Sequence, residues 1–222
     1  SEGAILSPLV AQNGYVKIDG LLLCGYSNEN LRDTFIWQAN GNASLIQYRR
    51  LFDYDRKGFI TINDFKEDRF HVRREVFGEF TFEQIDSDGD GNLTATDFAP
   101  AGVEHLNNML SAIERNDDEW LKNNHGIRLT SSWWKEHFSL EPNKLVLPRL
   151  NLPIHIFTGE YDFMTPQFHS RNIEQRFNAL GKTNLTVHYF ENHDHDLNYI
   201  KWLVKGELSD GMKCLFEAAE SI

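Results

Sequence analysis

The 222-residue chain contains few of the residues that mark specialised protein classes. It has only 2 cysteines and 6 prolines, which excludes a disulfide-stapled miniprotein and a collagen-like repeat. No run of about 18 apolar residues occurs, so the sequence predicts no membrane span. Basic residues are also scarce, with 22 lysines and arginines against 33 aspartates and glutamates, a net charge of −11. Nucleic-acid binding requires a basic surface that neutralises phosphates, so this class of protein is disfavoured.

The composition that remains is typical of a folded protein, with 41% apolar and 13% aromatic residues. Strand-like and helix-like segments alternate at both ends of the chain, which indicates a parallel α/β sheet with flanking helices. The expected strands are 18–24, 154–158 and 186–190, and the expected helices around them are 3–12, 167–180, 197–204 and 209–220. We therefore predict an α/β core formed by residues 1–38 and 141–222, with an all-helical insertion over residues 39–140.

The strongest local signal is an acidic loop over residues 86–97, named loop two, with the sequence DSDGDGNLTATD. Carboxylates stand at loop positions 1, 3, 5 and 12, a glycine at position 6 and an aliphatic residue at position 8. A hard cation binds six to eight oxygens, and a tight glycine turn directs alternate residues at one centre. The pattern predicts a calcium site; the alternative is a solvated acidic turn. The expected ligands are Asp86, Asp88, Asp90, the Asn92 carbonyl and Asp97, with Thr94 acting through water.

A second acidic loop, residues 53–64 or loop one, fits the same pattern at positions 1, 3, 6, 8 and 12. Its position 5 is Lys57, which cannot donate an oxygen, so we expect weak ion binding or none. The ligands there would be Asp53, Asp55, the Phe59 carbonyl and Asp64.

Over residues 43–105 the two loops resemble the EF-hand family, and the resemblance implies that they dock through Ile60 and Leu93. Both loops end in aspartate rather than the usual glutamate. The shorter side chain reaches an ion less easily, which lowers calcium affinity or shifts it toward magnesium. Weak affinity slightly favours a calcium-rich, extracytoplasmic compartment.

Near the C terminus, two predicted strands run into loops that present an acid and two histidines. Residues 154–166 lead from a strand to Asp162, and residues 187–197 lead from the next strand to His193 and His195. The carboxyl ends of parallel strands meet at one edge of a sheet, where ligands bind. We therefore expect the acid and a histidine to face one crevice; a hydrogen-bonded structural histidine is the alternative.

These segments resemble the C-terminal part of the α/β-hydrolase family, where G-x-x-D-x-x-T-P supplies the acid and a D-H-D-L-like turn supplies the base. The resemblance implies that Asp162 orients the imidazole of His195, the general base, with His193 as the alternative. Because the family order is Ser, Asp, His, the opening Ser1-Glu2-Gly3 resembles the second half of the G-x-S-x-G elbow. Ser1 would then be the nucleophile and the Glu2 backbone N–H an oxyanion donor. The resemblance also implies that an N-terminal hydrolase segment or chain completes the sheet.

The sequence thus predicts a serine hydrolase that cleaves a small-molecule acyl substrate, such as a carboxylic ester, with the helical insertion as a calcium-stabilised lid. Peptidases, thioesterases and acyltransferases share the same elements. The contrasting hypothesis is a non-enzymatic calcium-binding module on a hydrolase-like scaffold.

Overall fold

The computed structural model describes residues 2–222, which form two compact units. Unit 1 combines the chain up to Thr34 with Ser139–Ile222, and unit 2 is Phe35–Phe138. The sequence placed these boundaries at residues 38 and 140. None of the described helices is both long and apolar enough to cross a membrane.

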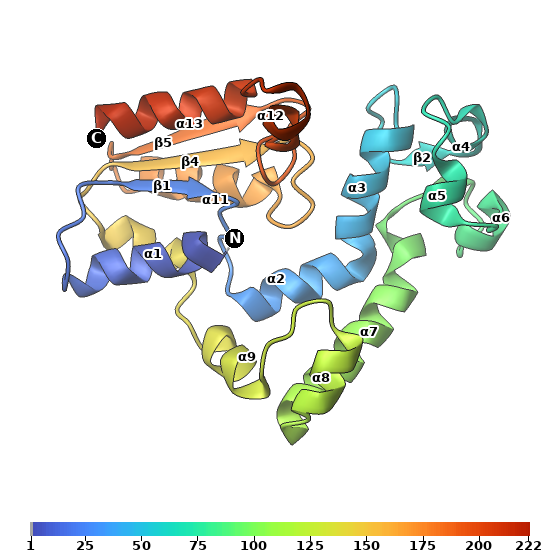
Figure 1. Cartoon of the computed structure of the whole chain (residues 1–222), viewed down its shortest axis with the longest axis horizontal. Coiled ribbons are helices and arrows are strands. Elements are labelled where there is room, and N and C mark those ends of the chain that lie inside the picture. The colour runs from blue at the N-terminus through green and yellow to red at the C-terminus, as the bar shows by residue number, and fades with distance from the viewer. Residues whose placement is uncertain (1) are drawn as a thin grey trace. The chain divides into compact units, whose positions relative to one another are not determined.

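Unit 1 contains a three-stranded parallel sheet in the order β1-β4-β5 (Figure 1). The strands are β1 (Leu21–Cys24), β4 (Ile154–Gly159) and β5 (Leu185–Phe190). The register pairs Leu21 with Ile154 and Ile154 with Leu185. Parallel neighbours explain why these segments are apolar, because helices cover both faces of such a sheet. The fold is therefore a mixed α/β fold with a small parallel sheet and flanking helices.

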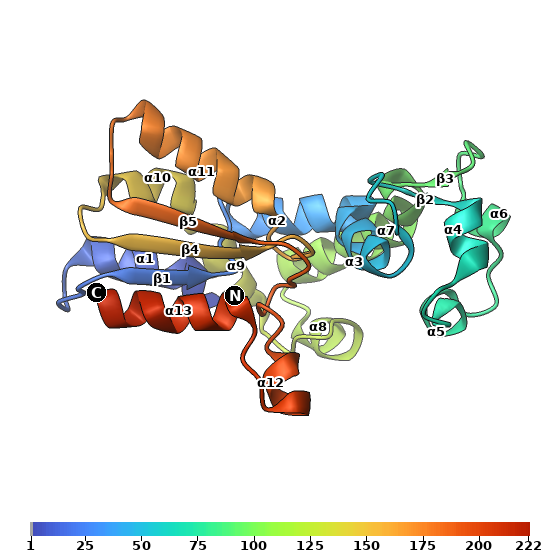
Figure 2. The same cartoon turned by 90° about the horizontal axis from the view of Figure 1, so that it is seen from above.

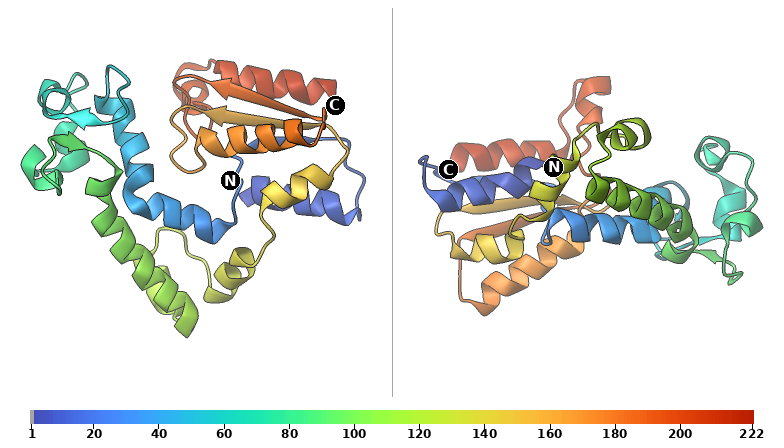
Figure 3. Two further views of the ribbon diagram at one scale, coloured as in Figure 1. Left: turned by 180° about the vertical axis from the view of Figure 1, so that it is seen from behind. Right: turned by 90° about the horizontal axis from the view of Figure 1, so that it is seen from below.

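The helices of unit 1 pack on the two faces of this sheet, and α11 and α13 lie on opposite sides of it (Figures 2 and 3). On one face, side chains of β1, β4 and β5 such as Leu23 and Ile156 contact Ala4 of α1 and Phe177 of α11. On the other, Phe157 packs with Ala218 of α13. The unit 1 helices are α1 (Glu2–Asn13), α10 (Asn143–Val146), the short 3-10 helix η2 (Leu147–Arg149), α11 (Gln167–Ala179), α12 (Ile200–Lys205) and α13 (Asp210–Ser221).

One predicted helix of unit 1 begins later than the sequence indicated. The apolar pattern placed its start at Leu197, whereas α12 starts at Ile200. Leu197 and Asn198 have φ values of 54° and 57°. These values lie in the left-handed region, so the two residues cannot be part of a right-handed α-helix. The Asp194 carboxylate accepts hydrogen bonds from the N–H groups of Asp196 (3.2 Å) and Asn198 (2.7 Å). This local side-chain turn competes with the first helical turn and replaces it.

Unit 2 is helical apart from one short ladder in which β2 pairs antiparallel with β3. Aromatic side chains that include Phe52, Phe65, Phe77 and Phe82 form one hydrophobic cluster of this unit together with Ile60 and Leu93. α2 (Leu31–Trp37) begins in unit 1 and ends in unit 2. The other elements are the π-helix η1 (Gln38–Asn42), α3 (Ala43–Phe52), β2 (Ile60–Thr61), α4 (Ile62–Glu67), α5 (Arg73–Phe77), α6 (Phe82–Ile85), β3 (Asn92–Leu93), α7 (Ala95–Arg115), α8 (Asp118–Asn124) and α9 (Ser131–Phe138).

Candidate active site

The loop that follows β4 holds the carboxylate of Asp162 in a fixed orientation. Asp162 is 1% exposed, so its oxygens need hydrogen-bond donors from the protein. The backbone N–H groups of Met164 and Thr165 donate to Oδ1 at 2.9 and 2.8 Å, and the Thr165 hydroxyl donates to Oδ2 at 2.8 Å. Pro166 and α11 follow directly and end this loop.

His195, in the loop after β5, lies against this carboxylate. Its Nδ1 is 2.9 Å from Oδ1 and 3.0 Å from Oδ2 of Asp162. A carboxylate accepts, so Nδ1 carries the proton, and in the neutral ring Nε2 is then the basic nitrogen. The structure thus brings together the acid and one of the two histidines that the sequence placed at this edge.

His193 makes a different set of bonds, all with the backbone. Its Nδ1 donates to the carbonyl of Glu191 at 2.7 Å, and its Nε2 accepts from the N–H of Gly211 at 3.3 Å. Both ring nitrogens are therefore engaged: Nδ1 within the loop itself, and Nε2 with the start of α13. This arrangement fits the structural alternative that the sequence left open for a histidine in this loop.

Two glycines allow the histidine loop to approach the ends of β4 and β1 closely. A Cβ on Gly159 would lie 2.3 Å from the carbonyl oxygen of His193, and the N–H of Tyr161 donates to that same oxygen at 2.8 Å. A Cβ on Gly25, just after β1, would lie 2.2 Å from Cε1 of His195. In the sequence Gly25 directly follows the expected strand 18–24, and that position was the available signal.

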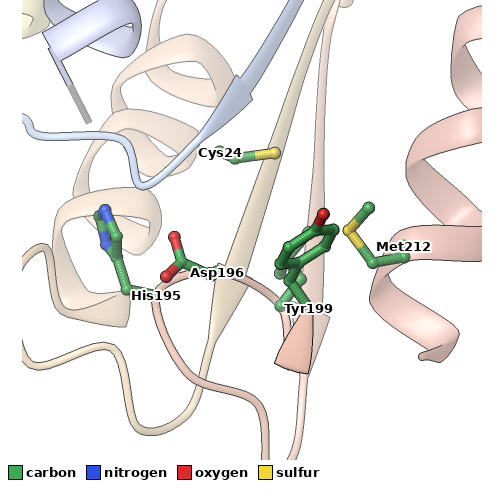
Figure 4. Close-up of a pocket in the computed structure, with 6 residues that line it drawn as sticks. Cys24, His195, Asp196, Tyr199 and Met212 are labelled. Carbon is green, nitrogen blue, oxygen red and sulfur yellow. The ribbon is translucent and has the colours of Figure 1, made fainter. Parts of the chain in front are cut away.

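A cavity of about 220 Å³ lies beside His195 and is lined mostly by apolar atoms. Figure 4 shows Cys24 at the end of β1, with Tyr199 and Met212 next to each other. Burial raises the pKa of the Cys24 thiol to about 11, so it stays protonated at neutral pH and is a weak nucleophile. The lining residues are Cys24, His195, Asp196, Leu197, Tyr199 and Met212.

The predicted nucleophile, Ser1, lies outside the described residues. α1 begins at Glu2, and this end of α1 lies near the C-terminal ends of the strands (Figures 1 and 2). The buried side chain of Asn143 donates to the carbonyl of Ala4 at 2.9 Å, which holds the first turn of α1 in place. The first N–H groups of a helix have no partner within the helix, so they are suited to bind an anion.

In loop two, three of the four predicted carboxylates come together. Oxygens of Asp86, Asp88 and Asp97 lie within 4.8 Å of one another, the one such group of potential metal ligands in the described chain. The Asp90 carboxylate instead accepts the N–H of Asn92 at 2.7 Å, and Asn92 itself begins β3. Three carboxylates this close are a donor set that a hard cation such as calcium or magnesium prefers.

In loop one, a lysine lies among the predicted ligands. The ammonium of Lys57 is 2.9 Å from Oδ2 of Asp64 and 3.5 Å from Oδ2 of Asp55. Asp53 accepts from the Arg49 side chain at 2.9 Å. Phe59 is half-buried immediately before β2. These carboxylates are thus paired with basic side chains of the protein.

A scan of protein-family models and a search of curated proteins found no match to this chain. The functional argument therefore depends on the geometry of these sites.

Proposed function

We propose that the protein is a serine hydrolase of the α/β-hydrolase type. The observation that carries the proposal is the bond from His195 Nδ1 to an Asp162 carboxylate that three further donors hold in place. A buried carboxylate that fixes the imidazole tautomer leaves Nε2 as a base, which is the arrangement of a catalytic acid-histidine pair.

In this proposal His195 Nε2 takes the proton of the Ser1 hydroxyl as its oxygen attacks the substrate carbonyl. The N–H of Glu2, at the first turn of α1, donates to the oxyanion that forms. The imidazolium, stabilised by Asp162, then returns the proton to the leaving group. Water repeats these steps on the acyl-enzyme and releases the acid.

The proposed substrate is a small acyl compound such as a carboxylic ester. The cavity beside His195 holds about 220 Å³, room for a small apolar group. In the proposed enzyme, calcium bound by Asp86, Asp88 and Asp97 is structural. The group that could hold the ion consists of carboxylates, and in the proposal the ion orders its loop without taking part in the reaction.

The proposal includes a further strand beside β1. Leu23 is 1% exposed in a strand that, among the described residues, pairs on one side only, with β4. Apolar edge strands tend to acquire a neighbour. As the hydrolase resemblance implies, an upstream segment or a separate chain would supply it.

Labelling with a fluorophosphonate, followed by peptide mapping, tests the proposal. We expect the label on Ser1, and loss of labelling in Ser1→Ala and His195→Ala. His193→Ala is the matched control, because it removes an imidazole from the same loop and should keep the label. Labelling that persists in Ser1→Ala would contradict the assignment.

The second candidate is a calcium-binding module without catalysis, favoured by the grouping of Asp86, Asp88 and Asp97. Calcium uptake by a protein that never reacts with the fluorophosphonate, with or without its upstream segment, would favour it over the hydrolase.

A further inference from the structure

Loop one and loop two share framework contacts at corresponding positions. In the β2–β3 ladder Ile60 pairs with Leu93, so the eighth residues of the two loops face each other. In each loop the first aspartate accepts the N–H of the position-6 glycine: Gly58 to Asp53 at 2.8 Å and Gly91 to Asp86 at 2.9 Å.

The last aspartates also correspond. Asp64 accepts the N–H of Thr61 at 2.9 Å, and Asp97 accepts the N–H of Thr94 at 2.7 Å. The ends of the two loops share these bonds, and two basic side chains distinguish loop one: Arg49, 2.9 Å from Asp53, and Lys57 at position 5.

That position is Lys57 in loop one and Asp90 in loop two. The Lys57 ammonium contacts the carboxylates at positions 3 and 12, Asp55 at 3.5 Å and Asp64 at 2.9 Å. The Asp64 side chain is only 6% exposed, and that of Lys57 is 29% exposed. Loop one holds three aspartates and two basic residues, whereas loop two holds four aspartates and no basic residue.

We propose that the ammonium of Lys57 is a built-in cation that takes the place of a divalent ion in loop one. A buried carboxylate needs a counter-charge and donors, and Lys57 supplies the charge from within the loop. Loop one is then ordered at any calcium concentration, and loop two alone is left to respond to the ion. This inference does not depend on hydrolase activity.

The test uses the full chain with Asp86→Ala, which disables loop two. In this background Lys57→Asp restores the acidic residue that loop two has at position 5. We expect the Asp86→Ala protein to take up no calcium at millimolar concentration by calorimetry. The double variant should bind one calcium with a dissociation constant of about 10⁻⁵ to 10⁻³ M, and its melting temperature should rise with calcium.

Lys66→Asp in the same background is the matched control, because it makes the same charge change at an exposed lysine of α4. It should bind no calcium. A folded Asp86→Ala/Lys57→Asp protein without calcium uptake would overturn the proposal, as would equal uptake with Lys57 in place.

A second measurement decides the case if the double variant does not fold. Lys57→Met keeps the length of the stem and removes the charge. We expect a lower melting temperature without calcium, while Lys57→Arg, which keeps the charge, should recover most of the loss. An unchanged melting temperature in Lys57→Met would show that the ammonium is not the counter-ion of loop one.

Discussion

Replacing Gly25 with alanine tests whether the space beside the imidazole of His195 is required. The new Cβ would lie 2.2 Å from Cε1 and 2.9 Å from Nε2 of His195. Unbonded carbon atoms stay about 3.5 Å apart or more, so the ring would have to move by more than about 1 Å. The bond from Nδ1 to Asp162, now 2.9 Å, would then be lost or distorted.

The size of the effect follows from that displacement. A misplacement of about 1 Å in an active site costs about 10²-fold in rate, and loss of the correct imidazole tautomer costs up to about 10⁴-fold. We therefore expect kcat/KM of Gly25→Ala to fall by about 10²- to 10⁴-fold, or about 2.7 to 5.4 kcal/mol. Alanine at the Gly25 φ of 66° also lowers stability, by about 1–2 kcal/mol.

Gly14→Ala separates the steric effect from the backbone strain. Gly14 has a φ of 69°, but nothing lies within 4 Å of the position of its Cβ. It should lose similar stability and keep its activity. The assays are hydrolysis of a p-nitrophenyl ester, with any upstream segment present, and thermal unfolding of both variants.

A readout that does not need turnover is the downfield proton resonance of an imidazole N–H bound to a carboxylate. It should be present in Gly14→Ala and absent or shifted in Gly25→Ala. Wild-type activity in Gly25→Ala, or an equal loss in Gly14→Ala, would refute the steric argument.

Three further predictions concern separate parts of the molecule. His193→Ala should keep its activity within about fivefold of the wild type. It should lose about 1–3 kcal/mol of stability in urea unfolding, because the Gly211 N–H loses its acceptor. A folded but inactive variant would show that His193, rather than His195, is the base. Calcium at a hundredfold excess over its dissociation constant should stabilise the wild type by about 2.7 kcal/mol, and Asp86→Ala should abolish the accompanying rise in melting temperature; no calcium uptake at millimolar ion would end the loop two proposal. Burial lowers the pKa of His169 to about 4, whereas the unfolded chain titrates near 6.5. The unfolded state then binds more protons between these values. The contribution of His169 to the free energy of unfolding is therefore complete above pH 6.5 and falls by about 3 kcal/mol as the pH approaches 4. The free energy of unfolding of His169→Gln should fall less steeply across this range, and an equal fall would contradict the assignment of the low pKa to His169.

The sheet of unit 1 was predictable because its strands are short apolar runs bounded by glycine, proline and polar residues. The predicted strand 154–158 is observed as Ile154–Gly159, and 186–190 as Leu185–Phe190. The start of α12 was not predictable from apolar periodicity, because the Asp194 carboxylate binds the N–H of Asn198. A side chain that competes with helical hydrogen bonds leaves no trace in that periodicity.

The pairing of Asp162 with a histidine followed from strand topology, but the choice of histidine did not. His193 and His195 are two residues apart in one loop, so any argument from the strands applies to both. The tertiary contacts separate them: the Gly211 N–H, at the start of α13, meets His193, whereas Asp162 meets His195.

Loop one shows a similar division between charge and geometry. From the sequence, Lys57 was expected to weaken ion binding, because it offers no oxygen at position 5. That its ammonium reaches Asp64, seven residues further along, depends on how the loop folds back on itself. Charge counting alone therefore predicts repulsion of a cation, whereas the structure adds a counter-ion that can stabilise the loop.

The bonds of the two histidines explain how one loop can hold a base in place. His193 joins the loop to α13 through Gly211, and its own carbonyl accepts the N–H of Tyr161 beside Asp162. Those bonds hold the backbone of the loop that carries His195, and Asp162 holds its ring. Because Gly159 and Gly25 carry no side chains, the histidine loop can contact the acid loop and the end of β1 without a steric clash. In the proposed enzyme, backbone contacts thus position the histidine loop, and Asp162 orients the imidazole in the tautomer in which Nε2 can accept a proton.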